Sequence, residues 1–218
     1  MRSKIEKTPL KQLLNFKNVD WGLHFCPTVI KNKNIIGYHG PIVNLGQDVK
    51  NNYGLNILKS TIDNIKGYDY LTIHLHNGLE PDKDILLNNL DELSNYAKKK
   101  NVKVCIENLR TGFSSNPYNV IEMADNCKCN ITFDIGHVNY NSREEFIDIF
   151  SNKIYNVHLY ELEKEGIGHI PPKNLDNLKP VLDKLLDNNC DFWLIELMKL
   201  EEIINTKKLL KEYLNDYK

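Results

Sequence analysis

The sequence contains 218 residues, of which 41% are hydrophobic, and its formal net charge at pH 7 is −1. This length and apolar content suit one compact core, so we expect residues 1–218 to form a single domain. The near-neutral charge disfavours nucleic acid or an acidic membrane surface as the main partner. Lysine supplies most of the positive charge, and the only arginines are Arg2, Arg110 and Arg143.

Neither a membrane span nor a secretory leader is expected. No apolar run approaches the ~18 residues of a transmembrane helix, and residues 1–14 lack the continuous apolar segment of a signal peptide. The five cysteines are scattered, and the CxC pair of Cys127 and Cys129 has no second pair to complete a zinc site. Free thiols of this kind are typical of a reducing compartment, so we expect a cytoplasmic protein without membrane contact.

Short runs rich in apolar and β-branched residues recur along the chain and predict strands. They span residues 19–25, 34–39, 70–76, 102–107, 130–134, 154–159 and 192–196. Residues 3–6 are a weaker candidate, and counting them brings the number of expected strands to eight.

Segments of helical period separate most of these runs. The clearest spans residues 81–100, with Asp82 and Asp84 at its start and three lysines at its end, as the helix dipole prefers. Ser142 and Glu145 have the spacing of a capping box ahead of another helix. Further apolar stripes predict helices around residues 55–65, 175–185 and 201–217.

Strands that alternate with helices of this length predict βαβ units and a parallel sheet. Eight such units predict an α/β protein with a compact (β/α)8 TIM barrel, near the short end of the usual length. The first two units are abbreviated, because residues 19–39 leave hardly any room for a full helix.

Potential metal ligands stand at the ends of six expected strands, about one βα unit apart. They are His39, His76, Glu107, Asp134, His158 and Glu196. Parallel strands place their carboxyl ends on one face, so these side chains should converge on the barrel mouth. Clustered carboxylates repel one another unless a cation neutralises them, which predicts a divalent metal site. Zn or Mn is favoured, Fe or Ni would also suit these donors, and no organic cofactor is expected.

The segments around these positions follow a recognisable order. They are YHGPIVNLG at residues 38–46, IHLHNG at 73–78, CIENL at 105–109, FDIGH at 133–137, VHLYE at 157–161, GHIPP at 168–172 and LIEL at 194–197. Together they resemble the xylose-isomerase-like TIM-barrel superfamily over residues 35–198. That superfamily holds sugar phosphate isomerases and epimerases, and AP endonucleases of the endonuclease IV type. The resemblance implies that the metal quartet shared across the superfamily is Glu107, Asp134, His158 and Glu196.

The resemblance also implies an outer set of metal ligands. His39 and His76 match ligands of an additional metal in the endonucleases, and His137 and His169 match two of three ligands of a third. The missing member of that third set is an aspartate, and Ile167 stands at its position. The resemblance therefore leaves the third site without its carboxylate.

Three residues are candidates for contact with the substrate. Arg110 opens a Gly- and Ser-bearing loop after an expected strand and would grip a phosphate or carboxylate, although a solvated arginine is an equal alternative. His137 lies just beyond Asp134 and would contact either a metal or the substrate. Glu161 stands where the family often has aspartate.

Two further histidines receive plainer interpretations. His74 lies two residues before His76 and faces the same side of the strand, so we interpret it as a deeper, supporting or core histidine. The pair also resembles the H-x-H motif of metal-dependent hydrolases, but that motif belongs on the first barrel strand. His24 is interpreted as structural.

The favoured function is that of a metal-dependent isomerase or epimerase acting on a sugar, sugar phosphate or polyol. The metal would stabilise an enediolate, and Glu107 and Glu196 would act as the catalytic pair that moves the proton at carbon. The expected partner is therefore a small carbohydrate-like molecule.

Two alternatives stay open. The first is an AP endonuclease or phosphodiesterase with a two- or three-metal cluster, which the extra histidines favour. Ile167, the scarcity of arginine, and Ile42 in place of an aromatic wedge disfavour DNA as a partner. The second is a specialised iron enzyme or a non-catalytic homologue, since these donors accept several metals. Neither the substrate nor the oligomeric state follows from the sequence.

Overall fold

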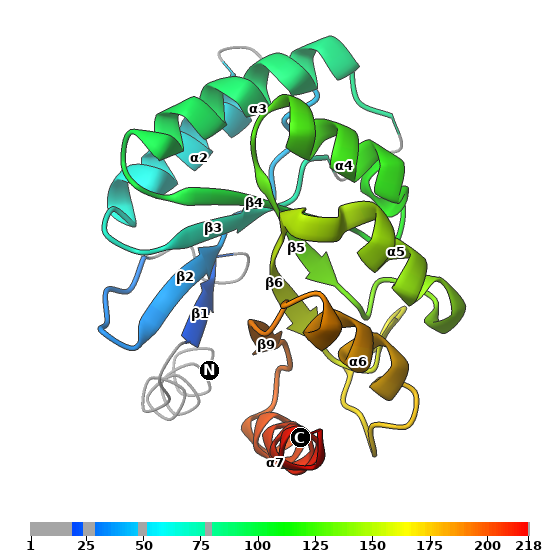
Figure 1. Ribbon diagram of the computed structural model, residues 1–218. Helices are drawn as coiled ribbons and strands as arrows, with labels where there is room; N and C mark the ends of the chain where they lie inside the picture. The colour runs from blue at the N-terminus through cyan, green and yellow to red at the C-terminus, as the bar shows by residue number, and fades with distance from the viewer. Residues whose placement is uncertain (1–18, 24–28, 48–51, 77–79, 218) are drawn as a thin grey trace.

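The computed structural model describes residues 19–23, 29–47, 52–76 and 80–217 of the chain (Figure 1). Seven parallel strands form one sheet in the order β1-β2-β3-β4-β5-β6-β9, so each strand lies beside the next parallel strand along the chain. The strands are β1 (Val19–Gly22), β2 (Ile35–His39), β3 (Tyr70–Ile73), β4 (Lys103–Glu107), β5 (Asn130–Asp134), β6 (Ile154–Leu159) and β9 (Trp193–Ile195). A separate antiparallel hairpin consists of β7 (Leu162–Lys164) and β8 (Gly168–Ile170).

Helices cover the outer side of the curved sheet (Figure 1). They are α2 (Tyr53–Asn64), α3 (Lys83–Lys98), α4 (Pro117–Asn126), α5 (Arg143–Phe150), α6 (Lys179–Asp187) and α7 (Leu200–Asp216). This succession of parallel strands and covering helices is the winding of a TIM barrel, which confirms the predicted fold class. No helix in the described ranges is both long and apolar enough to cross a membrane.

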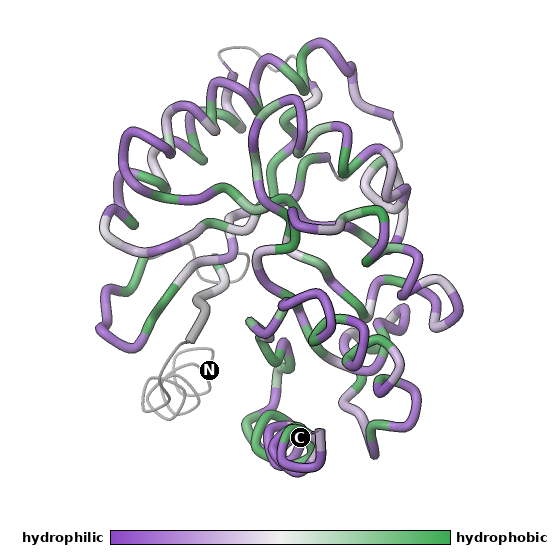
Figure 2. The backbone as a smooth tube through the Cα atoms, viewed as in Figure 1, coloured by the Kyte–Doolittle hydropathy of each residue, from purple (hydrophilic) through white to green (hydrophobic). Residues whose placement is uncertain are grey.

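The helix α3 illustrates how the sequence specifies these elements. The side chain of Asp82 accepts hydrogen bonds from the N–H groups of Asp84 and Ile85 and so caps the first turn. The predicted apolar stripe is fully buried, including Leu86 and Leu90. Burial of each such leucine contributes roughly 2 kcal/mol relative to exposure. Along the helices, apolar and hydrophilic residues alternate, as an inner and an outer face require (Figure 2).

Several local predictions were wrong. Ser142 makes no side-chain capping bond, because it ends a 3-10 turn with a helical backbone in place of the extended one of a cap. Helix α6 begins at Lys179, after a turn that holds Leu175 outside it. Helix α4 had not been predicted, although Asn116 caps it and Pro117 opens it.

The start of the chain is described only in part. The candidate strand at residues 3–6, His24 and the end of the predicted strand 19–25 lie outside the described residues. In the described stretch 29–34, between β1 and β2, no helix forms, which agrees with an abbreviated unit.

Candidate metal centre

Four predicted ligands meet where the strands end. Each offers a donor atom within 4.8 Å of the others, and the group consists of Glu107, Asp134, His158 and Glu196. His158 Nδ1 lies 3.1 Å from Glu107 Oε1, 3.0 Å from Glu196 Oε2 and 3.8 Å from Asp134 Oδ2. Strand register explains this convergence: Asp134 pairs with His158 across β5 and β6, and Glu196 directly follows β9. We call these four residues the quartet.

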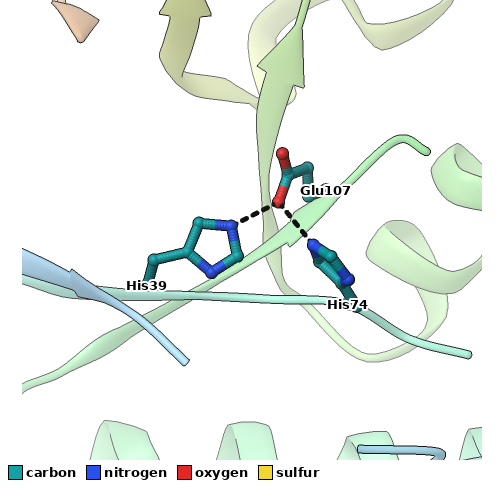
Figure 3. A group of neighbouring side chains, drawn as sticks. All are labelled: His39, His74 and Glu107. Carbon is teal, nitrogen blue, oxygen red and sulfur yellow. Dashed lines mark hydrogen bonds and ion pairs between the residues drawn. The ribbon is translucent and has the colours of Figure 1, made fainter. Parts of the chain in front are cut away.

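A second donor group shares Glu107 with the quartet. His39 Nε2 lies 2.7 Å and His74 Nε2 3.1 Å from Glu107 Oε2 (Figure 3). The other carboxylate oxygen, Oε1, faces His158. The three donors again lie within 4.8 Å of one another. A carboxylate between two donor groups is arranged to serve a cation on either side.

His74 occupies the place in this group that sequence analysis gave to His76. Strands β3 and β4 are paired up to Ile73 and Ile106, so His74 and Glu107 are the next residues along the two neighbouring strands. The His74 side chain therefore turns toward Glu107. His76 is buried, and its Nδ1 has no hydrogen-bond partner among the described residues.

The hairpin β7–β8 carries most of a third donor group, formed by His137, Glu163 and His169 within 4.8 Å of one another. Glu163 and His169 are paired residues of the hairpin, so both side chains leave the same face. His137 Nε2 lies 3.5 Å from Glu163 Oε2, and Arg110 Nε lies 3.2 Å from the same oxygen. We call this group the hairpin cluster.

Glu163 was not among the predicted ligands, because the resemblance places the missing carboxylate at position 167. Ile167 is instead 64% exposed in the turn directly before β8. The signal that was available is the pair Gly166 and Gly168, both with positive φ, between two short runs.

Both imidazoles of the hairpin cluster are held in a defined tautomer. His137 Nδ1 lies 2.9 Å from the carbonyl oxygen of Asn108, and His169 Nδ1 lies 2.8 Å from that of Glu196. A carbonyl oxygen only accepts, so each Nδ1 carries the proton. In the neutral imidazole Nε2 then holds a lone pair, as a metal ligand requires.

Tyr160 connects the quartet to the hairpin cluster and was also missed. Its hydroxyl donates to Asp134 Oδ2 at 3.1 Å, and its ring stacks on His169 with centroids 3.9 Å apart. The ring lies against Gly136, where an added Cβ would come within 2.0 Å of it. The only signal in the sequence is Gly136 in the FDIGH segment.

Electrostatics favour a cation among these carboxylates. Burial alone would lower the pKa of His39, but Glu107 outweighs it and raises that pKa to about 9. Burial would also lower the pKa of His158. Glu196 and Glu107 outweigh burial there and raise that pKa well above its ordinary value. The protons on His39 and His158 thus supply two positive charges, the same charge that a divalent cation would bring. The donor set therefore fits a divalent metal ion.

The pKa values of the three quartet carboxylates are shifted in different directions. Burial opposes ionisation of Glu107, yet His39 and His158 hold its pKa well below the ordinary value. His158 likewise overcomes burial and lowers the pKa of Glu196 to about 2. Burial raises the pKa of Asp134, and the charges of Glu107 and Glu196 add to the effect. A cation would relieve this repulsion.

The three predicted substrate contacts are not brought together. Arg110 and His137 both approach Glu163 at the mouth. Glu161 belongs to another network, in which its Oε1 accepts hydrogen bonds from Tyr140 at 2.8 Å and Asn177 at 2.9 Å.

Residues 32–213 match the family described as xylose isomerase-like TIM barrel, and the chain belongs to that family. An uncharacterized protein of Methanocaldococcus jannaschii is 54% identical over 94% of this chain and 92% of its own length. Among solved structures, a D-tagatose 3-epimerase-like protein superposes with a TM-score of 0.70 at 23% identity, covering 84% of this chain and 78% of the other. A xylose isomerase-like TIM barrel protein of Mycobacterium smegmatis, in complex with magnesium, has a TM-score of 0.65 at 12% identity, covering 93% and 86%. These structural likenesses show the fold.

Proposed function

We propose that this protein is a divalent-metal-dependent isomerase or epimerase of a sugar, sugar phosphate or polyol. The observation that carries the proposal is the quartet, in which Glu107 and Glu196 approach the same nitrogen of His158 from different strands. The name of the D-tagatose 3-epimerase-like neighbour supports the reaction class, and the magnesium complex of the other neighbour supports a divalent ion.

The quartet would hold the ion, which would bind neighbouring substrate oxygens and stabilise the negative charge that develops on them. Glu196 has the access that a base at carbon needs, because its side chain is 29% exposed and its low pKa keeps it ionised. Glu107 is only 1% exposed, and one of its carboxylate oxygens contacts both His39 and His74. We propose that Glu196 takes the proton from carbon and that Glu107 completes the transfer on the other side.

Exchange of substrate hydrogen with solvent deuterium tests this proposal. A panel of ketoses, sugar phosphates and polyols is incubated in D2O with Mn²⁺, Zn²⁺ or Mg²⁺, and label at carbon is measured by NMR. We expect label in at least one compound and a loss of about 100-fold or more in Glu196→Gln. The matched control is Glu92→Gln, because Glu92 is 56% exposed on α3. No label in any compound with any metal would contradict the proposal.

A metal-dependent phosphodiesterase, including an AP endonuclease, is the second candidate. The observation that favours it is the presence of several overlapping donor groups among the described residues, since hydrolases of phosphodiesters use two or more ions. Reaction assays separate the candidates: exchange of hydrogen at carbon without phosphodiester cleavage favours the isomerase, whatever number of ions the metal-loaded protein holds. Cleavage of an abasic duplex, lost in Glu196→Gln, would place hydrolysis first.

We further propose that Glu163 completes a cation site with His137 and His169, in place of the carboxylate expected at position 167. The short distances between the donor atoms support this assignment, and so do the tautomers of His137 and His169, which the backbone carbonyls fix. Glu163→Gln should lower the bound metal by one equivalent when more than one ion is present. Glu165→Gln, in the turn of the same hairpin, should leave the metal content unchanged. Equal metal content in both variants would contradict the assignment.

A further inference from the structure

Asn108 is the first residue after β4 and is completely buried. Its Oδ1 accepts a hydrogen bond from the N–H of Asp134 at 2.8 Å, and its Nδ2 donates to the carbonyl of Asp134 at 2.9 Å. One side-chain amide thus pairs with both backbone groups of a quartet residue.

The side-chain amide of Asn108 makes the hydrogen bonds to Asp134 that a longer β4 would make with its backbone. The ladder between β4 and β5 ends with Glu107 paired to Thr132, two residues short of Asp134. The backbone then leaves the sheet, and the N–H of Leu109 donates to the carbonyl oxygen of Ser114 at 3.0 Å instead of to a strand. The Asn108 side chain supplies the donor and acceptor that a continued strand would have offered to Asp134.

The backbone of Asn108 contacts the other cluster. Its carbonyl oxygen lies 2.9 Å from His137 Nδ1 and fixes the tautomer that leaves Nε2 facing Glu163. His137 is also tied to the quartet directly, since its N–H donates to Asp134 Oδ1 at 3.0 Å. Asn108, Asp134 and His137 therefore form one closed set of hydrogen bonds.

We propose that Asn108 is a positioning residue that keeps the quartet and the hairpin cluster aligned, by fixing Asp134 through its side chain and His137 through its carbonyl. The inference rests on the proposed metal-dependent function. Groups that orient metal ligands in this way typically change metal affinity 10–100-fold when removed. A buried asparagine with a purely structural role would alter stability alone.

Asn89 provides the matched control. It is also buried on α3, and its Nδ2 donates to a backbone carbonyl, that of Leu45, at 2.8 Å, which belongs to neither the quartet nor the hairpin cluster. Asn108→Ala and Asn89→Ala should both lower the midpoint of thermal unfolding, because each leaves buried backbone groups unpaired. Only Asn108→Ala should weaken metal binding.

The test is a titration of the folded, metal-free full chain with Co²⁺, followed by its ligand-field absorption. We expect an apparent Kd raised roughly 10–100-fold in Asn108→Ala and a wild-type Kd and spectrum in Asn89→Ala. If Asn108→Ala does not fold, Asn108→Asp keeps the volume and the bond to the Asp134 N–H but loses the donated bond. It should then show a shifted Co²⁺ spectrum.

Wild-type affinity and spectrum in a folded Asn108 variant would overturn the inference while leaving the metal site in place. An equal loss of affinity in Asn89→Ala would overturn it as well. Failure of the wild-type chain to bind Co²⁺, Mn²⁺ or Zn²⁺ would overturn the proposed metal-dependent function itself, and the inference with it.

Discussion

Raising the pH of the metal-free protein through about 9 removes the positive charge that His39 places beside Glu107. The pKa of His39 stands at about 9 in the folded chain against an ordinary value of 6.5. Its contribution to stability is therefore fully present below pH 6.5 and is lost as the pH rises through about 9. The difference of roughly 2.5 pKa units corresponds to a loss of about 3 kcal/mol in the free energy of unfolding.

A divalent cation should abolish this loss. When the metal takes the place of the imidazolium protons, binding becomes tighter as the pH rises, because fewer protons compete for His39 and His158. Metal-free protein should thus lose stability between pH 6.5 and about 9. Metal-saturated protein should keep its stability over this range or become more stable.

Urea unfolding at both pH values, with and without Zn²⁺ or Mn²⁺, measures these free energies. His39→Gln is the control, since it removes the titrating group and should flatten the wild-type pH dependence in the absence of metal. A metal-free wild-type protein as stable above pH ~9 as below ~6.5 would refute the reasoning. So would an identical pH dependence in His39→Gln.

Two further predictions concern the surroundings of the metal centre. Gly136→Ala should destabilise the chain by about 1–3 kcal/mol in thermal unfolding, because the new Cβ would displace the Tyr160 ring from its place beside the mouth. Gly22→Ala, where nothing lies within 4 Å of the added Cβ, should change stability by less than about 1 kcal/mol, and equal effects would count against the packing argument. His74→Ala should lower the metal bound per chain, measured by elemental analysis, whereas His76→Ala should not. The reverse result would return the ligand role to His76.

The quartet could be anticipated because its members are tied to strands. Two of the short strands, Asn130–Asp134 and Lys103–Glu107, end in a carboxylate. Such strand ends can be recognised from the sequence alone. Parallel pairing then brings consecutive strand ends together whatever the loops do. His74 could not be chosen over His76 in the same way, since both fit the period of the run and only the register of β3 against β4 places His74 beside Glu107. The single domain over residues 1–218 stays a prediction.

The roles of Asn108 and Tyr160 could not be predicted from the sequence for a different physical reason. The Asn108 side chain makes two hydrogen bonds to Asp134 and the Tyr160 hydroxyl makes one, and Asp134 lies 26 residues away from each along the chain. An asparagine or tyrosine at a strand end is common, and no spacing rule distinguishes one that bonds a ligand from one that bonds water. Only the packing of β4, β5 and β6 side by side selects these partners.

The hairpin cluster shows why a gap in a motif is weak ground for rejecting a site. A residue two positions before His169 would lie about 6.5 Å away along an ideal strand, and Ile167 falls outside β8 altogether. Glu163 lies directly across the hairpin from His169, where side chains of paired residues are typically about 5 Å apart. The cross-strand position is therefore the better place for a ligand, and it depends on hairpin register, which sequence spacing does not contain. A hydrophobic residue at position 167 is then compatible with a complete donor group at the mouth.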